Sequence, residues 1–384
     1  MLRLSIITIT TIMSILLVSS CRKEEEIIKS TTTDVGGKKD NDIKGFFLLN
    51  EGNMGSNKAS LDYYDYTTGH YHKNIYAERN PGVVKELGDV GNDIQIYGDK
   101  LYAVINCSHF IEVMDVNTAK HIDVVSIPNC RYIAFKDKYA YISSYAGPVQ
   151  LGDDRLGLVA KVDTATLEIV DSCIVGRQPD ELVVVGDKLY VANSGGYTAN
   201  NYDNTVSVID LNNFEEIKKI EVAINLHRLE LDRFGYLWVS SRGDYYDTPS
   251  KTFVIDSKTD EVVQEFALLP NSDMTICGDS LYVYSAEYSK KHETNTVTYA
   301  IVNTKTREIV SRSLIKDGSD KDIEIPYSIS VNPKTKEFFV TDAKDYVTPG
   351  KLHCYSPEGK LKWSVITGDI PAHIVFTSKV LENK

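Results

Sequence analysis

Two recurring sets of side chains in this sequence are suited to ligand binding. The first set consists of tyrosines with neighbouring amides and one arginine, and it lies in polar segments between apolar runs. Tyrosine presents a large, stiff surface with a hydrogen-bonding tip, a combination that binding interfaces favour. We predict that these residues contact a ligand: Asn53, Tyr145, Tyr197, Arg242, Tyr245, Tyr246, Tyr288 and Tyr346.

The second set stands where short apolar runs begin, and it mixes acids, bases and neutral polar groups. Its members are Asp93, Arg131, Asp180, His227, Arg228, Asp273, Tyr327 and His373. If they surround one funnel, such a mixture suits a neutral or zwitterionic ligand with many amides better than a polyanion. The alternative is that these charges satisfy one another around a water-filled channel.

Motifs of the common catalytic classes are absent from the sequence. It contains no G-x-S-x-G, no H-E-x-x-H and no Gly-rich phosphate loop. His70 and His72 would share one face of a strand, as paired metal ligands do, but they stand beside a short turn at the opposite end from the other candidates. We therefore expect a binding protein with no catalytic residue, no metal site and no cofactor.

Repetition indicates which elements position the candidate residues. The phrase Gly98-Asp99-Lys100-Leu101-Tyr102 recurs unchanged at 186–190 and nearly intact at 278–282. A phrase that returns at multiples of roughly 45 residues is typical of propeller blades. The sequence therefore predicts an all-β propeller of four-stranded antiparallel blades over residues 44–384.

Two strand signals give the number of blades. A strand holding an aromatic residue recurs at Phe47, Tyr102, Tyr141, Tyr190, Trp238, Tyr282 and Phe339, which makes seven blades. A strand running into a polar turn also recurs seven times, starting at Tyr64-Asp65-Tyr66-Thr67-Thr68-Gly69. The last inner strand, residues 371–376, has no aromatic strand after it, so we predict that it closes the ring beside residues 46–49.

The loops at the two ends of this ring differ in length. Turns at one end span a few residues, whereas long connections follow the aromatic strands and share their end with the starts of the inner strands. The long connections cover residues 50–58, 143–156, 193–203, 240–250, 285–294 and 342–349. Long loops on a rigid scaffold commonly carry function, so we place the ligand face at this end.

Residues 1–20 have the pattern of an export signal. Arg3 precedes an apolar run that is too short to span a membrane. The run ends in Leu17-Val18-Ser19-Ser20-Cys21, which resembles a bacterial lipobox, so we expect cleavage before Cys21 and lipid on its sulfur. The polar residues 21–43 that follow are predicted to form a flexible tether.

The net charge bears on the class of partner, and the cysteine content bears on disulfide bonds. The formal net charge of −12 argues against nucleic acid, whose phosphates require Lys and Arg stripes. Five cysteines remain after Cys21: Cys107, Cys130, Cys173, Cys277 and Cys354. Cys107 and Cys130 are candidates for a disulfide, and the others are expected to be buried thiols.

Two stretches of sequence carry a resemblance to a known family. They are Leu48-Leu49-Asn50-Glu51-Gly52-Asn53-Met54-Gly55-Ser56-Asn57 and Gly88-Asp89-Val90-Gly91-Asn92-Asp93. They resemble the YncE-like propellers of Bacteroidetes surface lipoproteins, and within these the BtuG-like cobalamin-binding group. The acidic cluster Glu24-Glu25-Glu26 behind Cys21 separately resembles the surface-export signal of such lipoproteins. The resemblance implies a lipid anchor on the outer membrane facing the cell exterior, cobalamin (vitamin B12) as the carried ligand, and a TonB-dependent, BtuB-like cobalamin transporter as partner.

Two other functions stay open at this stage. The first is a surface lipoprotein propeller that binds another ligand, such as a glycan. The second is a lactonase-like enzyme with a divalent metal held by Asp93, Asp273 and His373. Metal content separates the enzyme from the binding proteins, and competition by corrinoids separates the ligands.

Overall fold

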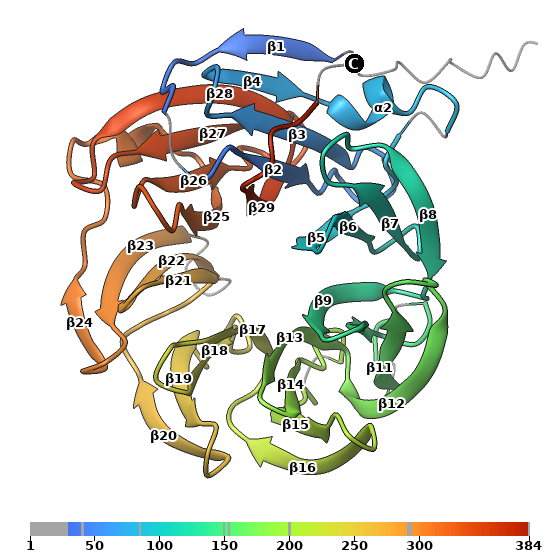
Figure 1. Cartoon of the computed structure of the whole chain (residues 1–384). Coiled ribbons are helices and arrows are strands. Elements are labelled where there is room, and N and C mark those ends of the chain that lie inside the picture. The colour runs from blue at the N-terminus through green and yellow to red at the C-terminus, as the bar shows by residue number, and fades with distance from the viewer. Residues whose placement is uncertain are drawn as a thin grey trace, which may run out of the picture.

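The computed structural model describes residues 30–39, 42–83, 86–148, 150–152, 154–198, 201–289 and 294–382. Seven antiparallel sheets surround a central axis in this part of the chain (Figure 1), which confirms the predicted seven-bladed propeller. From the axis outward, the first three blades contain these strands. Blade one holds β29 (Pro371–Thr377), β2 (Gly45–Asn50), β3 (Ser60–Asp65), β4 (His70–Lys73) and β1 (Thr31–Asp34); blade two holds β5 (Gly91–Tyr97), β6 (Lys100–Ile105), β7 (Phe110–Asp115) and β8 (His121–Ser126); blade three holds β9 (Cys130–Lys136), β10 (Tyr139–Ser144), β11 (Leu156–Asp163) and β12 (Ile169–Arg177).

The remaining four blades repeat the same four-stranded order. Blade four holds β13 (Pro179–Val185), β14 (Lys188–Asn193), β15 (Thr205–Asp210) and β16 (Glu215–Glu221); blade five holds β17 (Leu226–Leu231), β18 (Tyr236–Ser241), β19 (Lys251–Asp256) and β20 (Glu261–Phe266); blade six holds β21 (Asp273–Cys277), β22 (Ser280–Ser289), β23 (Thr294–Asn303) and β24 (Glu308–Ser311); blade seven holds β25 (Pro326–Val331), β26 (Phe338–Asp342), β27 (Pro349–Tyr355) and β28 (Leu361–Asp369). Two short helices, α2 (Ile75–Arg79) and η1 (Ser319–Asp322), lie outside the sheets. Neither of these two helices in the described ranges is long and apolar enough to cross a bilayer.

The two ends of the chain meet in blade one, as predicted. Strand β29 pairs antiparallel with β2, with Phe46 opposite Phe376 and Phe47 opposite Val375. The rings of Phe46 and Phe376 lie 5.8 Å apart. The last strand therefore covers the edge that β2 would otherwise expose and gives blade one an inner strand like those of the other blades, which closes the ring.

Strand β1 differs from the sequence prediction. Its residues Thr31–Asp34 fall in the segment expected to be a flexible tether, but they add a fifth, outermost strand to blade one. Thr32 pairs with His72 on β4, and its hydroxyl lies 3.0 Å from the His72 Nδ1 atom. Open backbone groups on the edge of β4 explain this pairing, because a polar β-branched segment can complete such an edge.

The core lies between neighbouring blades. The predicted aromatic residues Tyr102, Tyr190 and Trp238 are buried, and each packs against the inner strands of the next blade. Tyr102, for example, packs with Ile133 and Ala140 of blade three. Burying a large apolar side chain contributes about 1.5–3 kcal/mol, so this repeated contact stabilises every blade junction.

The repeated phrase has a structural reason. In blades two, four and six, the turn from the inner strand to the aromatic strand contains Gly98, Gly186 or Gly278 at φ angles of 64°, 56° and 66°. Positive φ at this position is what a two-residue hairpin turn requires, and glycine adopts it without strain. The phrase thus marks the tightest turns at the short-loop end.

The five cysteines of the described residues are free thiols. Cys107 and Cys130 are both free, so the candidate disulfide is wrong. The Cys130 sulfur instead lies 3.4 Å from the carbonyl oxygen of Phe110, while Cys107 lies 3.4 Å from Oδ1 of Asn106. Cys173, Cys277 and Cys354 are buried and free, as expected.

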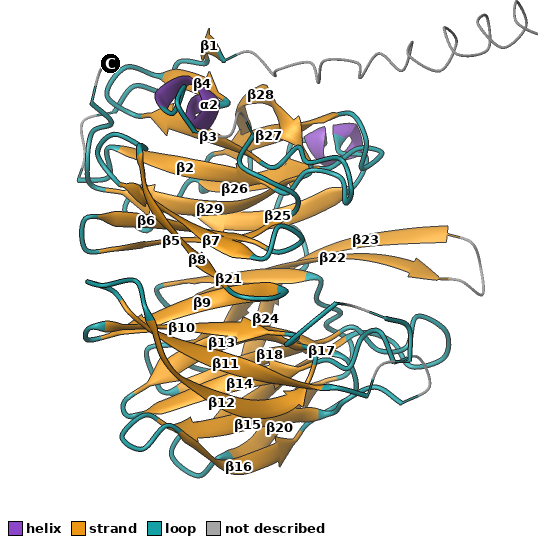
Figure 2. Cartoon of the chain, turned by 90° about the vertical axis from the view of Figure 1, so that its right-hand side faces the viewer, coloured by secondary structure: helices purple, strands orange, loops and turns teal. Residues whose placement is uncertain are grey.

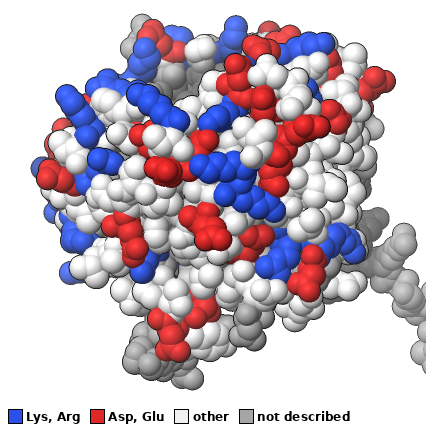
Figure 3. Space-filling view, turned by 90° about the horizontal axis from the view of Figure 1, so that it is seen from below, with Lys and Arg blue, Asp and Glu red and all other residues white. Residues whose placement is uncertain are grey.

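One long connection is a hairpin rather than a loop. Residues 285–289 of β22 pair with residues 294–298 of β23, so the strands of blade six continue past the ring. Figure 2 shows this hairpin projecting from the same end as the other long connections. On the side of the ring seen in Figure 3, acidic and basic side chains alternate without a large area of one sign.

Candidate functional site

A cavity of about 690 Å³ opens at the long-loop end of the ring. Residues of blades two, three, five, six and seven contribute to its wall, together with Glu51 of the blade-one loop. Its lining is mostly polar and aromatic: Glu51, Val90, Asn92, Arg131, Tyr132, His227, Arg228, Arg242, Tyr245, Tyr246, Asp247, Thr248, Pro249, Ser250, Asn271, Ser272, Tyr284, Ala286, Glu287, Thr296, Pro326, Tyr327 and Tyr346. This volume lies within the range of small-molecule sites.

The loop after β18 presents two tyrosines at the mouth of the cavity. The Asp244 Oδ1 atom accepts hydrogen bonds from the backbone N–H groups of Tyr246, Asp247 and Thr248, at 2.8–2.9 Å. This turn sets Tyr245 at a positive φ of 66°. Tyr245 and Tyr246 are consequently 43% and 61% exposed, which leaves both rings available to a ligand.

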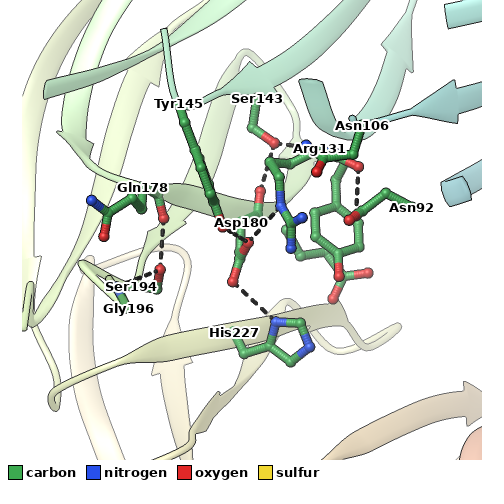
Figure 4. Close-up of polar contacts among 12 residues, drawn as sticks. Asn92, Asn106, Arg131, Ser143, Tyr145, Gln178, Asp180, Ser194, Gly196 and His227 are labelled. Atoms are coloured by element: carbon green, nitrogen blue, oxygen red, sulfur yellow. Dashed lines mark hydrogen bonds and ion pairs between the residues drawn. The ribbon is translucent and has the colours of Figure 1, made fainter. Parts of the chain in front are cut away.

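Asp180 is the centre of a buried polar cluster in the channel wall (Figure 4). One carboxylate oxygen accepts from the Arg131 Nε atom at 3.2 Å and from the Tyr145 hydroxyl at 3.0 Å. The other oxygen lies 3.1 Å from Nδ1 of His227 and 3.4 Å from Nη1 of Arg242. Asp180 itself has no exposed surface, so these side chains replace its entire hydration shell.

The charges in this cluster determine its protonation. Burial raises the pKa of Asp180, but the neighbouring Arg131 and Arg242 charges outweigh burial, and its pKa lies below the ordinary value. Burial, together with the Arg242 and Arg228 charges, holds the pKa of His227 well below its usual value. His227 is therefore neutral at pH 7, and its contact with Asp180 is a hydrogen bond rather than an ion pair.

Arg228 forms a second cluster next to the first, because Tyr132 contacts both Arg228 and Arg131. Its Nε atom lies 2.8 Å from Asp273, and its Nη1 atom donates to the Tyr132 hydroxyl at 3.1 Å. Burial raises the pKa of Glu181 and of Glu230 nearby, and the proximity of other acids raises both further. The Arg228 charge opposes both shifts, and the resulting pKa of Glu181 is about 7.

A third group joins blades seven and one. The Tyr327 hydroxyl donates to Glu51 at 2.7 Å, and Nε2 of His373 lies 3.4 Å from the other oxygen of Glu51. The ring of Tyr346 meets that of Tyr327 edge-on at 5.9 Å. Asn53 donates to the backbone carbonyl of Tyr346 at 2.9 Å, which fixes the two loops against each other.

The whole propeller matches a known family. Residues 44–376 match the family described as domain of unknown function DUF5074. The chain belongs to the DUF5074 family. No curated protein matches it.

Solved structures similar to this DUF5074 chain show its fold. A quinonprotein alcohol dehydrogenase-like protein from Bacteroides thetaiotaomicron aligns with a TM-score of 0.59 and 14% identity, over 88% of this chain and 79% of that one. The hydrazine synthase of Kuenenia stuttgartiensis aligns with a TM-score of 0.54 and 16% identity, over 70% and 77%. The computationally designed Ika8 protein reaches 0.53 at 10% identity, over 90% and 94%.

The structure brings many of the predicted contact residues of this DUF5074 chain together. The cavity is lined by Arg131, His227, Arg228, Arg242, Tyr245, Tyr246, Tyr327 and Tyr346. The others do not line it: Asn53, Asp93, Tyr145, Tyr197, Asp273 and His373. Asp93, Tyr145 and Asp273 are buried behind it, and Tyr197 packs edge-on against the ring of Tyr145 at 6.2 Å. The Tyr288 side chain, Cys21 and the rest of residues 1–29 lie outside the described part.

A bulge at the start of an inner strand explains Tyr132, a lining residue that the sequence prediction missed. In β9, residues 131 and 132 both fall between the pairs Cys130–Ser144 and Ile133–Ile142, so one residue is extra. Strict alternation would send Tyr132 away from Arg131, but the bulge lets both line the cavity. The same irregularity occurs at residues 180–181 of β13 and 227–228 of β17.

The groups considered as metal ligands do not converge. Asp93 accepts backbone N–H groups of Ile94 and Ile133, and Asp273 pairs with Arg228. No set of three or more His, Cys, Asp or Glu side chains in the described ranges has the arrangement of a metal site. His70 and His72 are on the outer strand β4, away from the cavity.

Proposed function

We propose that this chain is a surface-anchored lipoprotein that captures cobalamin at the cavity of the long-loop end and passes it to a TonB-dependent outer-membrane transporter. The observation that carries the proposal is the cavity itself. Its lining combines hydroxyl, amide and guanidinium groups with exposed tyrosine rings. Cobalamin presents a rigid apolar ring with a rim of amides, and these groups pair with such a lining.

The size of the ligand is consistent with partial enclosure. Cobalamin has about 90 heavy atoms, and at about 0.3 kcal/mol each its contacts permit binding up to the practical ceiling of affinity. A cavity of about 690 Å³ surrounds only part of so large a molecule. The remainder stays accessible at the mouth, which suits a protein that transfers its ligand onward without altering it.

The lipoprotein part of the proposal rests on the sequence. Residues 17–21 resemble a lipobox, and acidic residues follow Cys21 as in surface-exported lipoproteins. The protein would then be held on the outer membrane by lipid alone, facing the cell exterior.

Equilibrium dialysis of the chain from Arg22 onward against cyanocobalamin tests the function. We expect one equivalent bound, and we expect the double variant Tyr245→Ala, Tyr246→Ala to bind at least tenfold more weakly, because two exposed aromatic contacts are lost. The matched control is Tyr139→Ala at the short-loop end, which should bind as the wild type does. If cyanocobalamin does not bind and a glycan does, the ligand is a carbohydrate and the cobalamin proposal is wrong.

A further inference from the structure

The Asp180 cluster contains more positive than negative charge. Arg131 and Arg242 both pair with Asp180. Among the described residues, neither arginine pairs with any other carboxylate. His227 adds no negative charge, because it is a neutral imidazole. The cluster therefore carries a net positive charge in the cavity wall.

Arg131 has donors that the protein does not use. Its Nε atom binds Asp180, but its two Nη atoms form no hydrogen bond to any residue in the described ranges. The guanidinium lies over the Tyr145 ring at 5.0 Å, and its side chain is 16% exposed. It thus lines the cavity with a rigid, oriented fork of free N–H groups.

Asp180 cannot satisfy those donors by turning. Both of its oxygens are occupied, one by Arg131 and Tyr145 and the other by His227 and Arg242. Arg228 differs in its charge balance, because its guanidinium lies beside two carboxylates, 2.8 Å from Asp273 and 3.9 Å from Glu181. The unused charged donors therefore belong to Arg131, and Arg242 adds a second positive charge through a guanidinium held by Asp180 and by Nδ1 of His227.

We propose that Arg131 and Arg242 form a subsite for a single anionic group of the ligand, a phosphate or a carboxylate. Arginine pairs with both through parallel N–H donors, and the partly buried site strengthens that contact. The inference rests on the proposed function for its choice of ligand: cobalamin has neutral amides on its rim and one phosphodiester in its nucleotide loop. The subsite is the place where that phosphodiester binds.

The test compares two corrinoids that differ in this group. Cyanocobalamin contains the phosphodiester, and dicyanocobinamide lacks the nucleotide loop that carries it. The wild type should bind cyanocobalamin about tenfold or more tightly than dicyanocobinamide. Arg131→Gln and Arg242→Gln should each lower the affinity for cyanocobalamin by about that factor and leave the affinity for dicyanocobinamide unchanged. The two variants differ in burial, so Arg242→Gln keeps the test valid if Arg131→Gln does not fold.

The control is Arg307→Gln, whose guanidinium stacks on Tyr236 rather than on the cavity wall. It should behave as the wild type does. If the arginine variants weaken the binding of both corrinoids equally, or of neither, the subsite is overturned while the cobalamin function stands. If neither corrinoid binds the wild type, the proposed function fails, and the subsite is tested by adding inorganic phosphate at constant ionic strength. A rise in the melting temperature of the wild type with phosphate that Arg131→Gln abolishes would support the subsite. The absence of such a rise would overturn it.

Discussion

Asp180 shows how single residues organise this channel. It is a fully buried carboxylate that holds two arginines, a tyrosine and a histidine in place. Removing one member of a buried ion pair leaves an uncompensated charge in the interior, which destabilises the fold. Breaking an exposed ion pair has little effect on stability. The position of this residue at the start of an inner strand was predictable from sequence, but its four partners were not, because they come from the two neighbouring blades.

We predict that Asp180→Ala lowers the free energy of unfolding by about 3–5 kcal/mol, because Arg131 and Arg242 lose their shared partner. Denaturant unfolding measures the change. The control is Asp187→Ala in the same blade, whose carboxylate pairs with Lys136 but is 70% exposed. That change should cost less than about 1 kcal/mol. Equal effects at the two positions would show that the cluster does not stabilise the fold.

The lowered pKa of His227 implies that the stability of the protein depends on pH. Its pKa is lowered in the folded protein relative to the ordinary value of 6.5, so its contribution is present above pH 6.5 and is lost as the pH falls. Relative to His227→Asn, the wild type should therefore lose about 1 kcal/mol between pH 7.5 and 5.5. Urea unfolding of both proteins at the two pH values measures this difference. A difference that stays constant with pH would contradict a neutral, buried His227.

At the scale of elements, the inner strands carry the site. Their strand nature follows from the short apolar runs and proline or polar entries in the sequence. Their bulges do not follow from the sequence, because an extra residue such as Tyr132 cannot be recognised in the alternation of apolar and polar residues. The hairpin of β22 and β23 escaped prediction for a related reason: its polar threonines and asparagine resemble a loop, although threonine favours strands.

We predict that shortening this hairpin affects binding more than stability. Replacing residues 286–297 with an Asn-Gly turn joins Ser285 to Thr298, which already pair. The replacement removes Ala286, Glu287 and Thr296 from the cavity wall but leaves the four-stranded part of blade six intact. Cyanocobalamin affinity should fall at least tenfold, and the melting temperature should change by only a few degrees. A large loss of stability with unchanged affinity would refute this role.

At the scale of the whole molecule, the repeats made the architecture predictable. The number of blades, the order of strands and the closure by the last strand all follow from spacing, because each blade buries its faces against its neighbours. The cavity was predictable only as a face. Which residues of that face converge depends on loop turns such as the one at Asp244, and the sequence does not determine their direction.

Ring closure gives a prediction at this scale. A chain ending at Ile370 lacks β29, which exposes the inner edge of β2 and the rings of Phe46 and Phe339. We expect it to lose cooperative unfolding and to aggregate, as proteins with open hydrophobic edges do. Circular dichroism during heating and size-exclusion chromatography measure both effects. The control is a chain that ends at Glu382, which keeps all of β29 and the contacts of Leu381 with the core, and it should behave as the full chain does. Cooperative unfolding of the shorter chain would show that closure is dispensable.

The central claim is that the long-loop end of this propeller captures cobalamin. The most direct test mixes the chain from Arg22 onward with cyanocobalamin and follows corrin absorbance through a desalting column. We predict that the colour elutes with the protein at one equivalent, with an absorption spectrum that shows an intact corrinoid. Complete separation of the colour from the protein would contradict the claim.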